Sequence, residues 1–506
     1  MTATVRIRIL NEVYVAFVGL HPSDLTYFYN EHAVFAPNYF FNPRFKIGQW
    51  DGKIRFFEKT GRTFLYLLED ILPKIISMGY KIVVEDLCQA ALLTPTLVTP
   101  DTFSHIMHPL TGQPIKLRDY QVDSVNNLLI EGFGIIKAAT GAGKTLITAA
   151  LVKAWGDVGH RTITIVPDGT LIQQTKAMFK HCELDTGEYS GDEKSLDHQH
   201  VVSTWQALKN NPGIINSFQV VIVDECHGTK GPVLRELIID YAANIPHRYG
   251  VTGTLPPEPS DALTVITALG PVRYDITARQ LIDAGVLAEL HIDVIQLEED
   301  LTDEYNHFCN EVTVGIKPTY VQFKDGYFPD FAAEKAFLQR CKNRVSWIAD
   351  YLISTQDTVK SNTLVLVDSI PLGKELAEII PGSIFVNGKD VKKIADRKKI
   401  YDMFKTHDNL IVIATVHIAG TGLDIPRVFN LVLVDVGKSF IRVVQGIGRG
   451  LRKADDKDSV RIVDIAGDLK YSKKHLAARI KIYKEAGYPY TKHKINYNKF
   501  YEKGSN

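Results

Sequence analysis

Apolar and polar residues alternate in short segments over the first part of the chain. The alternation is clearest over residues 5–9 and 13–17, and it predicts two strands that each bury one face. Residues 53–57 and 63–67 flank a turn and predict a hairpin. These elements predict a small α+β domain over residues 1–86.

A different pattern begins near residue 113. Continuous apolar, β-branched runs alternate with helical periods, as a parallel sheet covered by helices requires. The runs predict strands at residues 135–137, 219–223, 363–367, 410–414, 431–434 and 462–465. The chain therefore predicts an α/β fold with two parallel-sheet lobes behind the N-terminal domain.

Composition changes suggest where these parts begin and end. Three prolines over residues 87–113 indicate a linker, so residues 1–112 form the N-terminal domain with its linker. The first lobe is predicted over residues 113–284, the second over 285–470, and a basic and aromatic tail over 471–506. An acidic and aromatic segment at residues 298–337 is interpreted as a helical insertion in the second lobe.

Candidate chemistry is concentrated first in Ala138–Thr145, AATGAGKT. An apolar strand precedes this segment and a helix-forming run follows it, which is the context of a phosphate-binding loop. Glycines let main-chain N–H groups close on phosphates, and a helix N-terminus favours the anion. Lys144 is expected to reach the β- and γ-phosphates, and the Thr145 hydroxyl to hold Mg²⁺. Ala138 stands where the strict pattern has glycine.

A second segment, Val223–His227, reads VDECH at the end of a predicted central strand. The carboxyl ends of parallel strands are where α/β sheets bind ligands. Asp224 is expected to hold Mg²⁺, and Glu225 to orient or deprotonate the attacking water. Two carboxylates that only cap a helix are the structural alternative, which the upstream phosphate loop makes less favoured.

The third segment, Gln445–Arg452, reads QGIGRGLR. Arg449 and Arg452 lie one helical turn apart, so both can face one ligand. Phosphoryl transfer needs cations on the γ-phosphate, and arginine supplies a planar, permanently charged group. A basic surface helix is the alternative, but three glycines are unfavourable in such a helix.

In this order the three segments resemble superfamily 2 helicases, and the similarity runs from about Leu117 to Arg452. The resemblance implies two RecA-like lobes, hydrolysis of ATP with Mg²⁺, and movement on nucleic acid. It implies coupling roles for Thr252 and Thr254. The ATP-binding residues that it implies are Arg118, Gln121, Ala139, Thr140, Gly141, Ala142, Gly143, Lys144, Thr145, Gly422, Asp424 and Gln445. The DNA-binding residues of the motor that it implies are Pro167, Gln174, Thr204, Trp205, Gln206, Thr415 and Thr421.

Residues 41–57, FNPRFKIGQWDGKIRFF, are similar to the N-terminal domain of the UvsW-type phage helicases, which remodel branched DNA. From the residues alone, a phosphate-contacting surface and a solvated hairpin face around a core Trp50 are equally favoured. Alternation along strands places Arg44 with Lys46 on one face, and Lys53 with Arg55 on another. The resemblance favours function, and these four side chains are then expected to bind DNA.

The remaining observations set limits on the protein class. Hydrophobic residues make up 45% of 506 residues, and no stretch is long and apolar enough to span a membrane. Five cysteines without a C-x-x-C pair favour a reducing cytoplasm and disfavour a zinc or iron–sulfur site. The formal net charge is zero, so any DNA-binding track must be local.

The basic and aromatic tail has two interpretations. It suits single-stranded nucleic acid, through phosphate attraction and base stacking. Alternatively, an amphipathic helix packs its tyrosines on the second lobe, which is favoured for the first half of the tail and equally favoured for its last fifteen residues.

Together these features predict a monomeric ATP-dependent DNA helicase in the cytoplasm of a phage-infected bacterium. Forks, junctions and single strands are its expected partners, and membranes are not. A duplex-DNA translocase that does not separate strands and an RNA helicase share the same motifs and stay open as alternatives.

Overall fold

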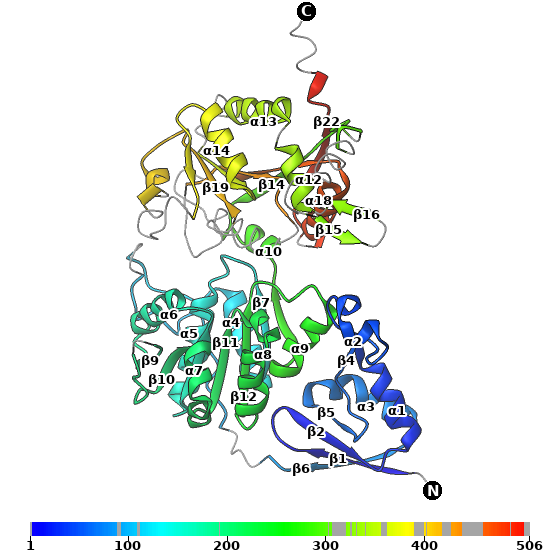
Figure 1. Ribbon diagram of the computed structural model, residues 1–506. Coiled ribbons are helices and arrows are strands. Elements are labelled where there is room, and N and C mark those ends of the chain that lie inside the picture. Colours follow the sequence, from blue (N-terminus) through cyan, green and yellow to red (C-terminus); the bar gives the residue numbers. More distant parts are fainter. Residues whose placement is uncertain are drawn as a thin grey trace, which may run out of the picture. The chain divides into compact units, whose positions relative to one another are not determined.

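The computed structural model describes residues 3–88, 93–108, 112–191, 193–301, 303–305, 320–323, 326–329, 331–339, 341–355, 362–388, 399–400, 402–416, 427–437, 459–485 and 487–499. The chain divides into two compact units, residues 1–276 and 277–506 (Figure 1). The boundary lies before α10 (Ala278–Asp283), whereas the sequence placed it after residue 284. The described elements confirm the predicted fold class: a small α+β domain comes first in the chain and two parallel sheets follow it.

The N-terminal domain is built on a four-stranded mixed sheet in the order β5-β2-β1-β6. Its strands are β1 (Thr4–Ile9), β2 (Tyr14–Val18), β5 (Arg62–Phe64) and β6 (Lys81–Asp86). Helices α1 (Pro22–Glu31) and α3 (Leu68–Ser77) accompany the sheet. Burial alternates along β1 and β2, so that Val5, Ile7 and Val15 are buried, which confirms both predicted strands.

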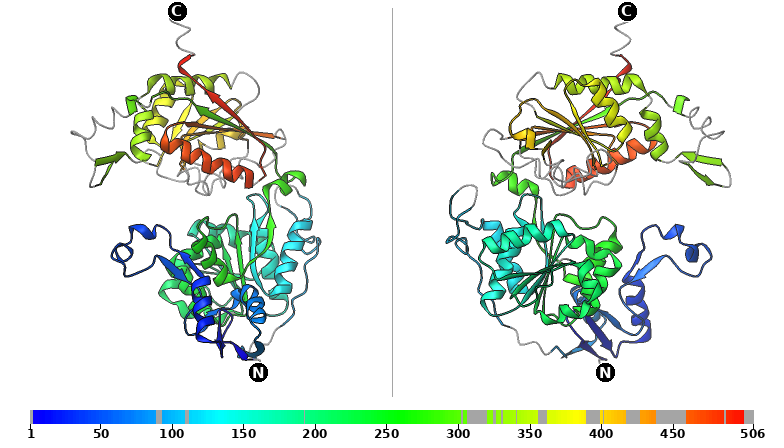
Figure 2. Two further views of the ribbon diagram at one scale, coloured as in Figure 1. Left: turned by 90° about the vertical axis from the view of Figure 1, so that its right-hand side faces the viewer. Right: turned by 60° about the vertical axis from the view of Figure 1, so that its left-hand side comes forward.

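An arm, residues 33–55, stands out from this domain in both views of Figure 2. It contains β3 (Ala33–Phe35), the 3₁₀ turn η1 (Tyr39–Phe41), α2 (Pro43–Lys46) and β4 (Lys53–Arg55), and β3 pairs with β4.

The predicted hairpin of residues 53–57 and 63–67 is therefore wrong, because β4 pairs with β3 and β5 pairs with β2. The two predicted segments share an isolated bridge, Phe57 to Thr63, and the Thr63 hydroxyl donates to the carbonyl of Phe56 at 2.7 Å. Arg44 and Lys46 also lie in a helix, where a spacing of two residues places them on different faces.

The first lobe has a seven-stranded parallel sheet in the order β13-β7-β12-β11-β8-β10-β9. Its strands are β7 (Phe133–Ala138), β8 (Thr162–Val166), β9 (Thr186–Tyr189), β10 (His200–Thr204), β11 (Val220–Asp224), β12 (His247–Thr252) and β13 (Val272–Ile276). Its helices are α4 (Asp119–Glu131), α5 (Lys144–Asp157), α6 (Gly169–His181), α7 (Trp205–Asn210), α8 (Pro232–Glu236) and α9 (Pro259–Leu269). Strands β8, β10 and β11 are buried almost throughout, as expected for the centre of a sheet covered on both faces.

The N-terminal domain packs directly on this lobe. The main-chain N–H of Glu12 donates to the carbonyl of Ala243, at 3.0 Å, and the Tyr66 ring lies 4.7 Å from the Phe133 ring. Buried apolar side chains of both parts form one hydrophobic cluster. The predicted linker thus separates two parts that share a core, and the stability of the first lobe depends on residues of the N-terminal domain.

The second unit has its own seven-stranded parallel sheet, in the order β18-β19-β17-β20-β21-β14-β22. The strands are β14 (Glu289–Leu297), β17 (Thr363–Val367), β18 (Ile384–Val386), β19 (Ile411–Thr415), β20 (Asn430–Val434), β21 (Ser459–Gly467) and β22 (Tyr490–Ile495). Helices α13 (Lys342–Ser354), α14 (Ile370–Ile379) and α18 (Lys470–Glu485) lie between strands of this sheet in the chain.

Two segments of this unit differ from expectation. The insertion at residues 298–337 contains a hairpin, β15 (Tyr320–Phe323) and β16 (Gly326–Pro329), before α12 (Phe331–Leu338), so it is not only helical. The predicted tail supplies most of α18 and all of β22, the edge strand that pairs with β14. Its Tyr483, Tyr488 and Tyr497 are buried, which agrees with tyrosines that pack on the lobe.

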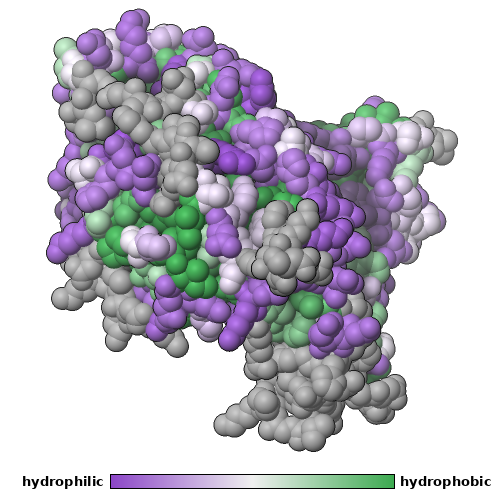
Figure 3. Space-filling view, turned by 90° about the horizontal axis from the view of Figure 1, so that it is seen from above, coloured by the Kyte–Doolittle hydropathy of each residue, from purple (hydrophilic) through white to green (hydrophobic). Residues whose placement is uncertain are grey.

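Hydrophilic side chains cover much of the face shown in Figure 3, and hydrophobic ones gather in smaller areas between them. Across the described residues, none of the helices combines the length and the apolar character needed to cross a bilayer.

Candidate functional site

The segment Ala138–Thr145 forms a turn between β7 and α5, as predicted. Gly141 and Gly143 have positive φ angles of 93° and 82°, which a side chain would strain. Gly143 also lacks room, because a Cβ there would lie 2.5 Å from Nε2 of Gln121. Since α5 begins at Lys144, the first N–H groups of the helix are available to an anion at this turn.

Gln121 ties helix α4 to the turn. Its side chain is 1% exposed, its Nε2 donates to the carbonyl of Ala142 at 2.8 Å, and its Oε1 accepts from the N–H of Arg118 at 3.0 Å. The Arg118 guanidinium donates to the Tyr120 hydroxyl, at 3.1 Å. These two predicted ATP-binding residues are thus joined to the phosphate loop, and their contact with ATP stays a prediction.

The acidic pair lies where the sequence placed it, at the carboxyl end of β11. Glu225 follows Asp224 in a left-handed conformation, with φ of 48°, and this turn directs its carboxylate toward the phosphate loop. Its Oε1 lies 3.1 Å from Nζ of Lys144, and both side chains are less than one-fifth exposed. The two segments predicted independently from the sequence therefore meet in one largely buried ion pair.

His227 adds a contact that the sequence did not predict. Its Nδ1 lies 3.0 Å from the Thr252 hydroxyl and 3.4 Å from Oε2 of Glu225. Thr252 also donates to the carbonyl of Thr254, at 2.9 Å. Both predicted coupling residues are thus connected to Glu225. Only the spacing within DECH pointed to His227, and its partner lies 25 positions away in the sequence.

Burial separates the protonation behaviour of the two carboxyl groups. Burial, helped by the negative charge of Glu225, raises the pKa of Asp224 to about 6. Burial would raise the pKa of Glu225 as well, but the hydrogen bond from His227 and the charge of Lys144 outweigh it and lower that pKa to about 2. Glu225 is therefore ionised at neutral pH, as an acceptor for a water proton must be.

The residues present fit a bound Mg²⁺ together with a nucleotide. Thr145 is the second residue of α5, and Asp224 is the last residue of β11. Their hydroxyl and carboxylate are oxygen ligands of the kind that Mg²⁺ prefers. Within the described residues no group of three or more His, Cys, Asp or Glu could hold a metal by itself.

A pocket of about 350 Å³ adjoins the acidic pair and is lined in part by Pro167, Trp205 and Leu234. Gln206 Nε2 donates to the carbonyl of Pro167, at 3.3 Å, and the Thr204 hydroxyl accepts from the N–H of Ala207 at the start of α7. Gln174 is exposed on α6. Four of the predicted DNA-binding residues thus lie together at the carboxyl edge of the sheet, and their contact with DNA stays a prediction.

In the second unit, Thr415 ends β19 and is 8% exposed. The other residues predicted there lie outside the described residues: Thr421, Gly422, Asp424, Gln445, Arg449 and Arg452.

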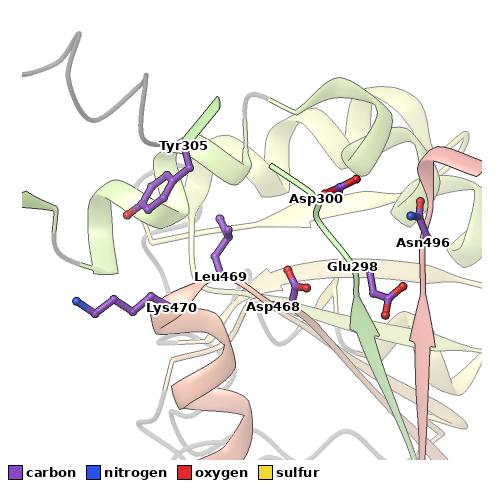
Figure 4. A pocket seen from close by; sticks show the side chains of 7 residues that line it. All are labelled: Glu298, Asp300, Tyr305, Asp468, Leu469, Lys470 and Asn496. Carbon is purple, nitrogen blue, oxygen red and sulfur yellow. The ribbon is translucent and has the colours of Figure 1, made fainter. Parts of the chain in front are cut away.

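A pocket of about 610 Å³ also opens in this unit at the carboxyl ends of β14, β21 and β22 (Figure 4). Glu298, Asp468 and Asn496 line it, and no motif in the sequence indicated it.

The four basic residues of the arm differ in their availability. Arg44 and Lys46 are exposed, and Lys53 Nζ lies over the Phe35 ring, 5.1 Å from its centre. Arg55 forms an ion pair with Asp51, and its side chain is 21% exposed. Any contact of these residues with DNA stays a prediction, and it is least favoured for Arg55 because Asp51 already neutralises it.

The His227 contact leads to a first prediction. In His227→Ala, Glu225 and Lys144 remain, so ATP turnover should fall less than strand separation. Losing a hydrogen bond to an ionised group costs about 1.5–3 kcal/mol, so the coupled step should slow roughly 10- to 150-fold. The measurement is ATP consumed per base pair separated. Thr252→Val removes the same contact from the other side and should raise this ratio similarly. A parallel loss of both activities would show that the contact does not couple them.

Three family models match successive parts of the chain. They are the N-terminal domain of the DNA helicase UvsW at residues 15–85, the res subunit of type III restriction enzymes at 114–257, and the helicase conserved C-terminal domain at 350–454. The first covers most of the N-terminal domain, the second contains the phosphate loop and the acidic pair, and the third contains the predicted arginines.

Individual proteins agree with these matches. The ATP-dependent DNA helicase uvsW of Enterobacteria phage T4 is 24% identical over 493 residues, which cover 91% of this chain and 93% of that helicase. Putative helicase 22 of Sulfolobus islandicus filamentous virus is 25% identical over 373 residues, 69% of this chain and 64% of that protein.

The fold also agrees with a solved structure. A fragment of a putative HsdR subunit of a type I restriction enzyme from Vibrio vulnificus aligns with a TM-score of 0.53 at 20% identity, covering 78% of this chain and 71% of the fragment. The chain is therefore similar to the UvsW helicase of phage T4 along most of its length, and its matched domains are those of an ATP-dependent DNA helicase.

Proposed function

We propose that the protein uses ATP to unwind or branch-migrate forked and junction DNA during phage replication, recombination and repair. In this proposal it works as a monomer in the cytoplasm of the infected bacterium. The observation that carries the proposal is the joined set of Lys144, Glu225, His227 and Thr252, which combines a phosphate-binding cation, a base and a coupling contact.

The chemistry follows from these contacts. Without nucleotide, Lys144 neutralises Glu225, and bound ATP offers Lys144 a second anionic partner. Once Lys144 is shared between Glu225 and the phosphates, the Glu225 carboxylate can accept the proton of the attacking water. Mg²⁺ held by Thr145 and Asp224 would offset phosphate charge. We propose that Arg449 and Arg452 stabilise the remaining charge of the transferring group.

Coupling requires that the motor bind DNA differently before and after hydrolysis. His227 Nδ1 lies 3.4 Å from Oε2 of Glu225 and 3.0 Å from the Thr252 hydroxyl. A change in the charge of Glu225 at the phosphate loop can therefore alter the contact with Thr252 on β12. Pro167, Trp205 and Gln206 lie at the same sheet edge as Glu225, and they are the proposed contacts to the strand.

The N-terminal domain is proposed to bind the branch point. Deleting residues 1–112 would not test this well, because the deletion exposes the part of the first lobe that shares a core with them. Substitutions in the arm leave that core intact and are the better test.

The second prediction uses the three arm cations that have no carboxylate partner among the ion pairs of the described residues. Arg44→Ala, Lys46→Ala and Lys53→Ala together should flatten the dependence of log affinity on log salt for duplex DNA. Each lost phosphate contact contributes about 0.9 to this slope, so the change could reach roughly 2.7. Arg55→Ala is the matched control and should change the slope less, because Asp51 neutralises it. An unchanged slope in a folded triple variant would make these cations structural.

The proposed function is tested by ATPase stimulation with single-stranded DNA, a fork, a four-way junction and an RNA duplex. We expect the fork and junction to stimulate turnover most. Greater stimulation by RNA would instead support an RNA helicase. Displacement of a triplex strand without opening of a fork would support a duplex translocase.

A further inference from the structure

The tip of the arm exposes large apolar side chains that the proposed cation contacts do not use. Phe40 and Phe41 are 50% and 61% exposed, and their ring centres lie 4.4 Å apart. Ile47, 66% exposed, belongs to the same arm. Apolar side chains gathered on an exposed element commonly mark an interaction site.

These rings stand on a packed support. Tyr39 stacks on Phe35 with ring centres 4.5 Å apart and meets Phe45 edge-on at 4.8 Å. Gly52 allows this packing, because a Cβ there would lie 2.5 Å from the Tyr39 ring. The Trp50 indole donates to the carbonyl of Lys53, at 2.9 Å, which fixes the turn between α2 and β4. The support fixes the turn that presents Phe40 and Phe41.

The charge around the rings is positive. The arm carries four basic residues and one acidic residue, in a chain whose formal net charge is zero. The acidic residue is Asp51, which lies just before β4 and pairs with Arg55 in that strand, and residues 36–50 contain no acidic residue. Arg44 and Lys46 follow the two phenylalanines within five residues and are exposed.

We propose that Phe40 and Phe41 form a stacking surface for unpaired bases at a DNA branch point, while Arg44 and Lys46 bind the adjoining phosphates. The inference rests on the proposed function and extends it to the contact that holds separated bases. Aromatic rings flanked by cations suit this ligand, because bases offer flat faces and the backbone offers anions at regular spacing. A purely apolar protein partner would not require the cations.

The test uses the full chain, without nucleotide, and a fork with 2-aminopurine in the unpaired strand next to the duplex. Binding of the wild-type protein should quench the probe by stacking. Phe40→Ala with Phe41→Ala should remove the quenching and weaken fork binding by about 5- to 150-fold per stacked base. Because both side chains are at least half exposed, the melting temperature should stay unchanged.

Three further measurements separate base stacking from plain apolar contact and from binding to a lipid surface. Phe40→Trp with Phe41→Trp should keep the quenching, whereas Phe40→Leu with Phe41→Leu should lose it although the surface stays apolar. Equal quenching by the leucine and wild-type proteins would overturn the proposal. A second result would also overturn the proposal. In it, the wild-type protein binds anionic phosphatidylglycerol vesicles in place of the fork, and the leucine and alanine variants lose this binding.

Failure of the proposed function gives a different result. If single-stranded DNA did not stimulate the ATPase of the wild-type protein, the motor assignment would fail. If DNA did stimulate it but the alanine variant bound and quenched like wild type, only the stacking surface would be wrong.

Discussion

Lys144→Ala should reduce ATP turnover by at least about 10²–10³-fold, the cost of removing one preorganised charge donor from a transition state. The substitution should act twice, because Lys144 is expected to contact the phosphates and also pairs with Glu225 and lowers its pKa. Without the Lys144 ammonium, the largely buried Glu225 carboxylate loses this cation, and its charged form is less favoured. The measurement is steady-state ATPase in the presence of single-stranded DNA.

Lys153→Ala is the matched control on the same helix. Lys153 pairs with Asp157 at 3.0 Å, away from the phosphate loop, and its loss should leave turnover close to wild type. Glu225→Gln should bind ATP and hydrolyse it slowly, because an amide cannot accept the proton of the attacking water. If Glu225→Gln turned over ATP like wild type, the VDECH segment would not supply the base.

Arg449→Ala and Arg452→Ala should each lower kcat by roughly 10³–10⁵-fold, the contribution of an arginine to the charge of a transferring phosphoryl group. Nucleotide binding should change far less, because the described phosphate loop belongs to the other unit of the chain. The measurements are single-turnover hydrolysis and the affinity for a non-hydrolysable nucleotide.

Arg461→Ala is the control in the same unit, since Arg461 pairs with Asp293 at 2.7 Å on the surface of the sheet. It should leave kcat nearly unchanged. A kcat within about threefold of wild type for both Arg449→Ala and Arg452→Ala would remove these residues from the transition state.

The sequence predicted the phosphate loop and the acidic pair well for a physical reason. Each is a strand, a short turn and a helix start, so the chemistry lies within a few adjacent residues. Lys144 and Glu225 also approach one another predictably, because the carboxyl ends of parallel strands meet at one edge of the sheet.

Contacts between distant segments were not predictable in the same way. His227 meets Thr252 only because β11 and β12 are neighbours in the sheet, an order that the sequence does not state. Residues 53–57 and 63–67 lie close in sequence, and their apolar and polar residues alternate well. In the structure, however, β4 pairs with β3 and β5 pairs with β2.

The charged and aromatic segments were ambiguous because composition does not specify partners. Arg55 was predicted as a DNA contact, but Asp51, four residues before it, forms an ion pair with it and neutralises its charge. In the tail, β22 pairs with β14 from nearly two hundred residues earlier, and the sheet buries Tyr497.

We propose that ATP hydrolysis at Lys144 and Glu225 drives the remodelling of branched DNA. The most direct measurement is the rate at which a mobile four-way junction is converted to duplex products, with ATP, by the wild-type protein and by Glu225→Gln. We predict rapid conversion by the wild-type protein, none without ATP, and almost none by Glu225→Gln although it binds the junction. Equal conversion with and without ATP, or by both proteins, would contradict the claim.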